Sequence, residues 1–489
     1  MDTTAGYTFE RQNDVVGNLV NSTQLARALA DPSPLTAFDP FGGPTSPATL
    51  DLIRSTSTFR GNSRIRFAHV AAVGAAPSGW GPDVAFTVGS DFRSESLSTY
   101  EHQDGTTPDT RLDATRDVTA FFGETCIPIN RSAPHQCTEE GTGATPQLHV
   151  TVSGRYERSS DFGGGAVPAV KLFWMPYSSL SWRGTWSKSF KVPDLADLSE
   201  TSNASTIYLF PGPSSPSQVS PTLVWSGNNR ELHRETARTW SLTGLFRPYF
   251  DPLLKIQAHY YATTFGNRVD APQFVADALA NPTTRNLITF NPTAAQQQEV
   301  CSRSLFLGGS ASCTSQSIQA IADFRLQNIS RLDTRGLDVD VSQDFHHGDA
   351  TWSTALNGVY IFRYVLSDPA GATDLVNTVD YPLRMRLLSR VSRSERDWEI
   401  GATVLYSGAY RDLTSTPVRQ VRSWTSVNAQ VVWRLPLEKS SEDTILSLDV
   451  QNLFDVRPPF TNNPAGIGWD PTNASVLGFT IKLTLTKHW

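Results

Sequence analysis

The feature that most constrains this chain is the alternation of apolar and polar residues in many long segments. Side chains of a β-strand point in turn to opposite faces, so this pattern predicts strands whose two faces differ. One such segment alternates Val84, Phe86, Val88 and Phe92 with Asp83, Thr87, Asp91 and Arg93. The same pattern returns near 148–157, 180–187, 445–450 and 477–485. Many segments run beyond the roughly 9–11 residues that a strand needs to cross a bilayer.

The pattern predicts sixteen strands, and their connections alternate in length. We place the strands near 6–13, 58–75, 83–99, 115–129, 146–160, 167–175, 179–190, 236–247, 252–266, 329–345, 350–366, 380–392, 397–411, 418–435, 443–454 and 474–488. Turns at 76–82, 175–178, 247–251, 346–349 and 393–396 alternate with loops at 14–57, 191–235, 267–328, 367–379 and 455–473. Two connections depart from this rule, the long 130–145 and the short 161–166. Short turns on one rim and long loops on the other are typical of an outer-membrane barrel. A soluble antiparallel sandwich would also alternate, but its strands are shorter.

Aromatic residues gather near the expected strand ends, where amphipathic rings prefer a membrane–water interface. They are Trp174, Tyr177, Trp182, Tyr249, Tyr260, Tyr261, Trp398, Tyr406, Trp424, Trp433 and Trp489. We interpret them as girdles, although the same rings could fill the core of a sandwich. The stretch Ser22–Ala30 is expected to form a helix within the first long loop, with Asn21 or Ser22 as its N-cap.

Composition limits the other possibilities. The 489 residues are 39% apolar, and mean hydropathy is −0.28. The chain contains no apolar run of about 18 residues, so no membrane-spanning helix is expected. A barrel exposes only one face of each strand to lipid, so a low apolar fraction is compatible with it. The net charge is −6, without a basic tract, which argues against nucleic-acid binding.

The four cysteines form two pairs that are close in sequence. Cys126 and Cys137 lie 11 positions apart, and Cys301 and Cys313 lie 12 apart. Local pairing into two disulfides is favoured over free thiols, because closing a short loop needs no long-range rearrangement. Neither pair has zinc-ligand spacing, and no metal or cofactor is expected. Disulfides would indicate an oxidising compartment, although the N-terminus shows no signal peptide.

Several segments resemble the barrel of a TonB-dependent outer-membrane receptor. Leu448-Asp449-Val450-Gln451-Asn452-Leu453-Phe454-Asp455 resembles the family's V-x-N-L-F-D strand, and the chain ends on an aromatic residue, Trp489. The run from Leu172 to Leu198 is similar to the family's W-x-P, L-x-x-R-G and S-F-x-x-P-x-L motifs. Segments 116–122, 235–240 and 334–338 resemble further strands, in the family's order. One departure is Gly478-Phe479, where the family usually has Gly-Arg.

The resemblance implies an all-β transmembrane barrel of 22 strands, of which this chain supplies about sixteen. Nothing before Tyr7 resembles the family's plug domain or TonB box, so residues 1–489 are expected to be a barrel fragment. The strands near 6–13 and 474–488 should then remain unpaired with each other. No enzyme motif is present, and the charged residues of the strands are expected to form ion pairs in the lumen. These residues are Asp91, Arg93, Glu95, Arg155, Glu157, Asp338 and Asp340.

The implied function is uptake of a large scarce nutrient, such as a ferric siderophore, cobalamin or an oligosaccharide. The expected partners are outer-membrane lipid, a small or medium extracellular ligand, and TonB with its inner-membrane energy complex. The long loops would bind the ligand first, and the candidate contacts are Trp225, Arg230, Arg268, Phe306 and Trp469. Two alternatives stay open: a plug-free passive pore, and a secreted β-rich glycan-binding protein.

Overall fold

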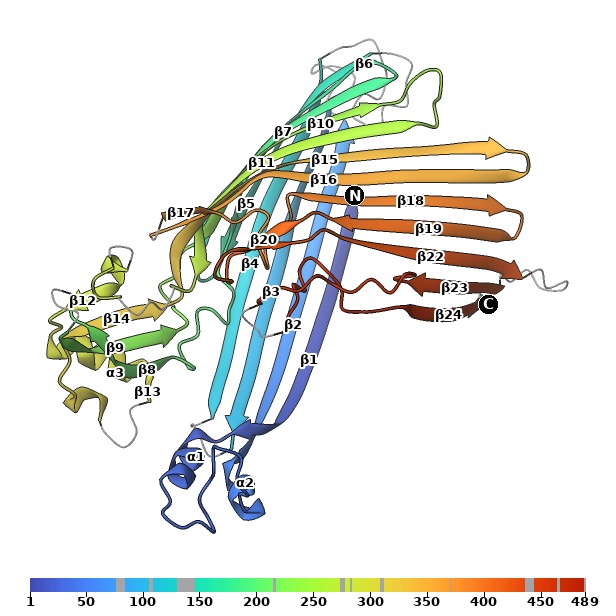
Figure 1. Cartoon of the computed structure of the whole chain (residues 1–489). Helices are drawn as coiled ribbons and strands as arrows, with labels where there is room; N and C mark the ends of the chain where they lie inside the picture. Colours follow the sequence, from blue (N-terminus) through green and yellow to red (C-terminus); the bar gives the residue numbers. More distant parts are fainter. Residues whose placement is uncertain are drawn as a thin grey trace.

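The computed structural model describes the chain except for 76–83, 105–108, 130–145, 214–216, 273–277, 282–283, 308–311, 370, 436–443, 464–466 and 488–489. Its main feature is one large antiparallel sheet, shown in Figure 1. Within these described residues, no helix is both long and apolar enough to cross a membrane.

Within the described part of the chain, sixteen long strands form the sheet, and each pairs with the next long strand in sequence. They are β1 (Asp2–Val20), β2 (Arg54–Ala75), β3 (Ala85–Gln103), β4 (Thr110–Pro128), β5 (Gln147–Ser159), β6 (Gly163–Tyr177), β7 (Leu180–Lys191), β10 (Glu235–Phe246), β11 (Lys255–Asp270), β15 (Gln327–His347), β16 (Ala350–Asp368), β18 (Met385–Glu395), β19 (Trp398–Ser407), β22 (Trp424–Leu435), β23 (Thr444–Gln451) and β24 (Thr480–Lys487). A short strand, β17 (Gly371–Asp374), pairs with the end of β16. Every predicted strand corresponds to one of these sixteen, so the predicted fold class is confirmed.

The sheet is strongly twisted, and its two outermost long strands do not meet. In Figure 1 the first strands run steeply, whereas β18 to β24 lie nearly across them. This is the cumulative right-handed twist of a many-stranded sheet. Among the described residues, β1 pairs with β2 and β24 pairs with β23, and no ladder joins β1 to β24. The sheet is therefore an open, curved wall. The predicted lack of pairing between its first and last strands is observed in the described residues.

The two faces of the wall differ in chemistry. One face exposes large apolar side chains, among them Val170, Leu172, Trp182, Trp240, Leu242, Phe246 and Ile400. The opposite face carries polar networks: Arg155 pairs with Asp91 and with Glu157, and Arg93 pairs with Glu95. We call these the outward and the inward face, because in a membrane barrel the apolar face meets lipid.

Aromatic rings stack across neighbouring strands near both rims. At the short-turn rim the rings of Trp398 and Trp433 lie 4.8 Å apart, and those of Phe345 and Trp352 lie 6.1 Å apart. Toward the long-loop rim, Trp186 and Trp240 lie directly opposite each other with ring centroids 6.1 Å apart. Such pairs are worth roughly 0.5–1.5 kcal/mol beyond their buried area. They place aromatic residues at both ends of the apolar band.

Two of the long loops fold together into one small unit. Its strands are β8 (Ala204–Pro211), β9 (Val219–Gly227), β12 (Ile288–Phe290), β13 (Leu305–Phe306) and β14 (Ala320–Arg325), in the order β12-β14-β9-β8-β13. The pairs β14–β9 and β13–β8 are parallel, so each joins one loop to the other. Helix α3 (Ala294–Ser302) packs against this sheet through the buried Val300. We call residues 203–232 and 278–325 the mixed-sheet unit, which lies to the left in Figure 1.

The other loops are smaller. The first carries α1 (Ser22–Leu29) and α2 (Pro47–Ile53) at the tip of β1 and β2. The side chain of Asn21 accepts a hydrogen bond from the amide of Gln24, at 3.1 Å, so the predicted helix and its N-cap are confirmed. The loops between β16, β18, β19, β22, β23 and β24 include β20 (Tyr410–Asp412) and β21 (Arg419–Val421). We call residues 376–383, 408–421, 452–463 and 467–477 the polar cap.

Candidate functional site

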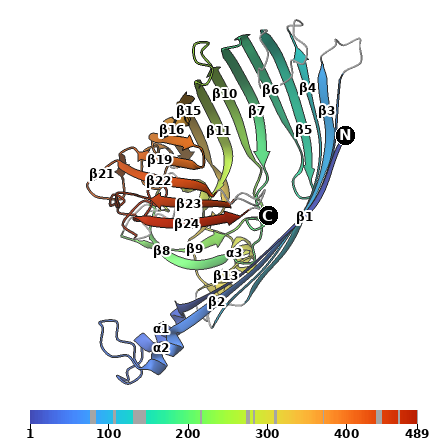
Figure 2. The ribbon, with the colours of Figure 1, turned by 90° about the vertical axis from the view of Figure 1, so that its right-hand side faces the viewer.

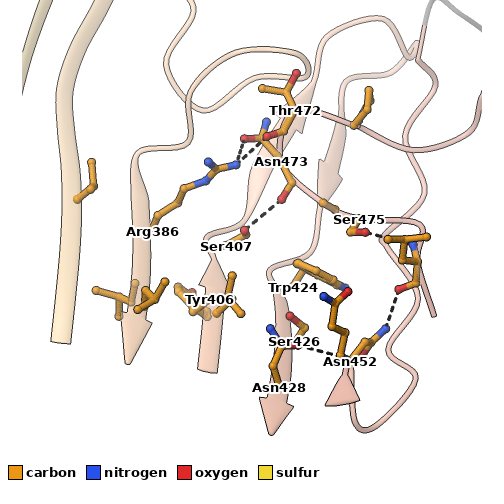
Figure 3. A pocket seen from close by; sticks show the side chains of 18 of the residues that line it. Arg386, Tyr406, Ser407, Trp424, Ser426, Asn428, Asn452, Thr472, Asn473 and Ser475 are labelled. Atoms are coloured by element: carbon orange, nitrogen blue, oxygen red, sulfur yellow. Dashed lines mark hydrogen bonds between the residues drawn. The ribbon is translucent and has the colours of Figure 1, made fainter. Parts of the chain in front are cut away.

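A pocket of about 480 Å³ opens on the inward face beneath the polar cap. Strands β18, β19, β22 and β23 form its wall, and the segment 471–477 covers it, as Figure 3 shows. Its polar lining residues are Asn357, Arg386, Ser407, Ser426, Asn428, Gln451, Asn452, Thr472, Asn473 and Ser475, beside the rings of Tyr406 and Trp424. The other lining residues are apolar, among them Val359, Leu388, Leu405 and Leu477, so the hydrogen-bonding groups stand among apolar surface, as in many ligand sites.

Strand register brings these side chains to one face. Leu405 lies opposite both Leu388 and Ser426, and Ser407 lies opposite both Arg386 and Trp424. Residues two apart on a strand share a face, so the pocket wall is set by the pairing of three strands. The apolar Leu388 and Leu405 share one row with Ser426. Arg386 and Ser407 lie one row nearer the long-loop rim, and Asn428 lies one row nearer the short-turn rim.

The covering segment is held by specific hydrogen bonds. The Arg386 guanidinium donates to the carbonyl oxygen of Thr472 at 2.8 Å and to Asn473 Oδ1 at 2.9 Å. The hydroxyl of the buried Ser407 donates to the carbonyl oxygen of Asn473 at 3.1 Å. Figure 3 shows these contacts joining the strand wall to the cover. Each bond to a charged group is worth about 1.5–3 kcal/mol, so Arg386 fixes the cover in place.

The V-x-N-L-F-D segment shapes the other edge of the pocket. Asn452 has φ of 49°, and its side-chain amide donates to the carbonyl oxygens of Val456 at 3.1 Å and Leu477 at 3.2 Å. Asp455 has φ of 50° and accepts from the amide of Phe479 at 3.0 Å. A Cβ on Gly478 would fall 2.6 Å from Asp455 Oδ1, so a larger residue there would displace this carboxylate. Asn and Asp tolerate this left-handed backbone better than other non-glycine residues.

A second cavity, of about 340 Å³, continues from the pocket along the inward wall. The two share Asn428 and Gln451, and the second adds charged groups from Arg390, Asp449 and Lys482. Gln430 donates to Asp449 Oδ1 at 2.7 Å. Together the two cavities make a polar track that begins under the cap and runs toward the short-turn rim.

Buried carboxylates organise the cap. Asp412 is fully buried and accepts from the amide and hydroxyl of Thr414, at 3.0 and 2.6 Å, and from the amide of Asn462 at 2.8 Å. Burial opposes ionisation of Asp412, but these hydrogen bonds outweigh it and lower its pKa. The pKa of Asp380 is raised by burial and by the charge of Asp470. The pKa of Tyr410 is raised by burial and by the same carboxylate.

The expected ligand contact Trp225 is a core residue instead. Its ring is 4% exposed, and the guanidinium carbons of Arg303 and Arg325 lie 4.9 and 3.4 Å from the ring centroid. Both arginines also bind Glu200, and the hydrogen bond from Arg325 to Glu200 Oε1 is 3.1 Å. The ring is therefore packed inside the mixed-sheet unit and is not open at its surface. Sequence pattern cannot show this, because the three residues meet only through the parallel pairing of two loops.

The other expected contacts are scattered. Phe306 packs against the same core as Trp225, and the exposed Arg230 lies 3.7 Å from Glu200. Arg268 pairs with Asp270 at 3.8 Å on β11, and the half-buried Trp469 belongs to the polar cap. The structure does not bring the five together. The inward-facing Trp424, Asn428 and Gln451 were missed, although their place on alternating strands signals an inward position.

The cysteines lie in two different parts of the chain. Cys301 and Cys313 form a disulfide within the mixed-sheet unit, with Cα atoms 5.8 Å apart. It ties the end of α3 to the short 3₁₀ turn η2 (Cys313–Ser315). Cys126 lies near the end of β4, and Cys137 lies outside the described residues.

Known proteins share this architecture. The family model described as TonB dependent receptor-like, beta-barrel matches residues 2–453. A mutant of the ferric enterobactin receptor PfeA of Pseudomonas aeruginosa, in complex with enterobactin, aligns with a TM-score of 0.57 at 14% identity, over 99% of this chain and 59% of that one. The structure of the FpvAI–pyocin S2 complex aligns with a TM-score of 0.56 at 12% identity, over 100% of this chain and 52% of that chain. No curated protein matches the sequence significantly.

This chain thus spans little more than half of the receptors that it resembles, and at such identities the likeness concerns the fold. The family match covers far more than half of the chain. The open sixteen-strand wall, with its apolar outward face and polar inward face, agrees with that match. The chain belongs to the family of TonB-dependent receptor-like β-barrels.

Proposed function

We propose that this chain forms the barrel part of an outer-membrane receptor that collects a scarce, medium-sized polar nutrient. Siderophores are the first candidates, because the structural neighbour PfeA was solved in complex with enterobactin. The observation that carries the proposal is the inward-facing pocket beneath the polar cap, which continues into a polar track. A volume of several hundred Å³ that combines apolar surface with many hydrogen-bonding groups suits a ligand of that size.

In this proposal the long-loop rim faces the outside, where such loops are longest in outer-membrane barrels. Release of the ligand inward would need a plug domain, a TonB box and the inner-membrane energy complex, which the full-length receptor would engage. Residues 1–489 would supply the wall and the ligand-collecting rim. The family is one of receptors and transporters, and the proposal assigns no reaction to the chain.

The test is a binding titration on the full chain refolded in detergent. Four compounds are added in turn: a ferric catecholate, a ferric hydroxamate, cobalamin and a maltooligosaccharide. Binding is followed by quenching of the tryptophan fluorescence, to which Trp424 in the pocket wall contributes. Gln451 lines both cavities, so Gln451→Leu should weaken binding of the active compound about tenfold, which corresponds to one good hydrogen bond. Gln257→Leu is the matched control, because Gln257 lies opposite Asp340 on the inward face, away from the pocket. Equal loss in both variants, or no binding of any compound, would contradict the proposal.

A planar-bilayer recording separates the receptor from a passive pore. With β1 and β24 unpaired, the chain alone should give no steady conductance, whereas stable large channels would favour a plug-free pore. Recovery of the native chain from the soluble fraction, without detergent, would instead favour a secreted glycan-binding protein.

A further inference from the structure

The inward pocket beneath the polar cap has a single charged residue in its lining. Its wall belongs to the later part of the sheet, and β19, β22 and β23, which carry much of it, lie one above another in Figure 2. Among the described residues that line the pocket, Arg386 is the one with a charged side chain. A bound anion would therefore depend on Arg386 alone, and a bound cation would find no carboxylate in the same lining.

Arg386 is already matched by a buried carboxylate behind the cover. Its guanidinium donates to Asn473 Oδ1 at 2.9 Å, and Asn473 Nδ2 in turn donates to Asp470 Oδ2 at 2.7 Å. Asp470 is fully buried, and its carboxylate also accepts from the backbone amides of Thr472 and Asp380. The Asn473 side chain thus joins a cation to an anion, and buried charges need such polar partners. Arg386 therefore anchors the cover and is not a spare cation for a ligand.

Two further carboxylates lie beside the pocket wall. On the β15–β16 ladder, Asp338 is opposite Val359 and Asp340 is opposite Asn357, and both Val359 and Asn357 line the pocket. The Asn357 side chain donates to Asp340 Oδ1, so this carboxylate is next to the lining. Like charges repel strongly where water is excluded. Both carboxylates would oppose the binding of an anionic ligand.

The second cavity is balanced in the same way. Arg390 lies 3.5 Å from the carboxylate of Glu399, and Lys482 lies directly opposite Asp449 on the β23–β24 ladder. Gln430 also donates to Asp449, at 2.7 Å. Each cation of the polar track thus has an acidic neighbour. An anionic chelate on the track would have to compete with these carboxylates, whereas an uncharged chelate would not.

The uncharged part of the pocket combines apolar surface with amide groups. Leu388 and Leu405 lie directly opposite each other and both line the pocket. Asn428 Oδ1 accepts from the backbone amide of Asn452 at 2.9 Å, so its Nδ2 is the atom that can donate to a ligand oxygen. Gln451 adds a second side-chain amide. Methylene chains that carry neutral oxygen acceptors match this mixture.

We propose that the pocket takes a ligand without net charge, of the ferric trihydroxamate class, and excludes anionic ferric chelates. Three hydroxamate groups neutralise a ferric ion, whereas three catecholate groups leave a net negative charge that needs cations in the site. Moving such a charge out of water without a partner costs far more than a hydrogen bond contributes. The inference rests on the proposed receptor function and narrows its ligand. The enterobactin bound to PfeA does not decide the ligand here, because that likeness concerns the fold.

The test measures retention of radioactive iron by the full chain in detergent. Ferrichrome, an uncharged ferric trihydroxamate, is compared with ferric enterobactin, which is anionic. Ferrichrome should bind at least about 30-fold more tightly, and its affinity should be the same at about 50 and about 500 mM salt, because it forms no ion pair to screen. Ferric enterobactin binding as tightly as ferrichrome, or a maltooligosaccharide binding in place of both, would overturn this inference and leave the receptor proposal standing. Failure of all three to bind would contradict both.

A charge-insertion variant gives a gain of binding, which a misfolded protein cannot mimic. Gln451→Lys places a cation where the two cavities meet, so it should tighten binding of ferric enterobactin about tenfold and leave that of ferrichrome within about threefold. Gln12→Lys adds the same charge on β1, away from the pocket, and should change neither affinity. The same gain in both variants, or no gain with Gln451→Lys, would overturn the inference.

The anchoring role of Arg386 has its own readout. Arg386→Gln should raise hydrogen exchange over residues 471–477 in the absence of any ligand, because the cover loses its bonds to Thr472 and Asn473. The preference for ferrichrome over ferric enterobactin should persist in this variant. A loss of ferric enterobactin binding alone, with exchange of the cover unchanged, would show that Arg386 is an anion-binding group and would overturn the inference.

Discussion

The mixed-sheet unit and the polar cap are both built from long loops of the same rim, yet different forces hold them. The unit has a true apolar core, with Leu223, Ala320 and Ala322 fully buried, and it is tied by a disulfide. The cap has one small apolar cluster around Tyr410, and its segments are joined chiefly by hydrogen bonds to buried carboxylates and amides. A loop can thus be ordered either by burying apolar area or by satisfying polar groups. The second solution leaves a polar pocket beneath it.

Trp225→Ala should give the largest difference in stability between the mixed-sheet unit and the polar cap. This change removes a buried ring that two guanidinium groups contact and should cost roughly 3–5 kcal/mol of the unit's stability. Hydrogen exchange should then rise in β8, β9 and β14, while exchange in the polar cap and the long strands stays unchanged. Trp424→Ala in the pocket wall, where the ring is only half-buried, is the comparison and should cost less. Faster exchange in both regions after Trp225→Ala would mean that the two are one cooperative unit.

Loss of the disulfide should give the second-largest difference in stability between the two regions. Cys301 and Cys313 are 12 positions apart, so replacing both by serine should cost about 3 kcal/mol by loss of the loop constraint. The expected result is faster proteolysis within residues 288–325 and no change within 452–477. Dithiothreitol should reproduce this on the parent chain and leave the double serine variant unaffected. The absence of any effect would show that the apolar core alone orders the unit.

In the polar cap, Asp412→Asn is the substitution that corresponds to these changes in the mixed-sheet unit. It removes the charge that strengthens the bonds from Thr414, Ser415 and Asn462, at a cost of about 2 kcal/mol. Asp380→Asn is the control, because burial and Asp470 already disfavour ionisation there. It should leave stability unchanged or slightly higher. The readout is hydrogen exchange over 410–415 and 461–463, and a reversed order would show that charge does not hold the cap.

Lowering the pH should give the smallest difference in stability between the mixed-sheet unit and the polar cap. Burial alone would raise the pKa of Glu200, but Arg303, Arg230 and Arg325 lower it below the ordinary 4.5. A lowered pKa means that this stabilisation is complete above 4.5 and is lost as pH falls through the folded value. Asp380 has a raised pKa, so it takes up its proton above its ordinary 3.8, and that step relieves repulsion with Asp470. Proteolysis from neutral pH downward should therefore show the cap unharmed at the pH where the mixed-sheet unit begins to loosen.

Alternation along the chain was enough to predict the sixteen strands, because each carries its own two-faced pattern. The predicted ends were less accurate: β1 runs from Asp2 to Val20, not from 6 to 13. Its later residues include Gly17 and the positive-φ Asn18, which interrupt the pattern without ending the ladder. The V-x-N-L-F-D segment is identified by resemblance alone. The structure shows that its Asn452 and Asp455 have positive φ and form hydrogen bonds to the neighbouring loop segments.

The ligand contacts could not be predicted in the same way. Trp225 and Phe306 are predicted contacts because they lie in long loops, which bind ligand first in this kind of barrel. They are packed against one core because β9 pairs with β14 and β8 with β13. Such pairing between loops about a hundred residues apart leaves no local signal. The pocket residues lie on regular strands, so they were predicted as strand positions but not as a site.

The parallel pairs of the mixed-sheet unit also fix an order of assembly. Asn229, just after β9, donates to the carbonyl oxygen of Leu326, just after β14, which lies 97 positions further along the chain. Contacts of such high sequence separation form late, after shorter loops have closed. The hairpin of β10 and β11 lies between the two partners and closes a much shorter loop, so we expect it to form before they meet. On this expectation the unit is the last part of its rim to mature, and its completion would report that the strands on either side are already in register.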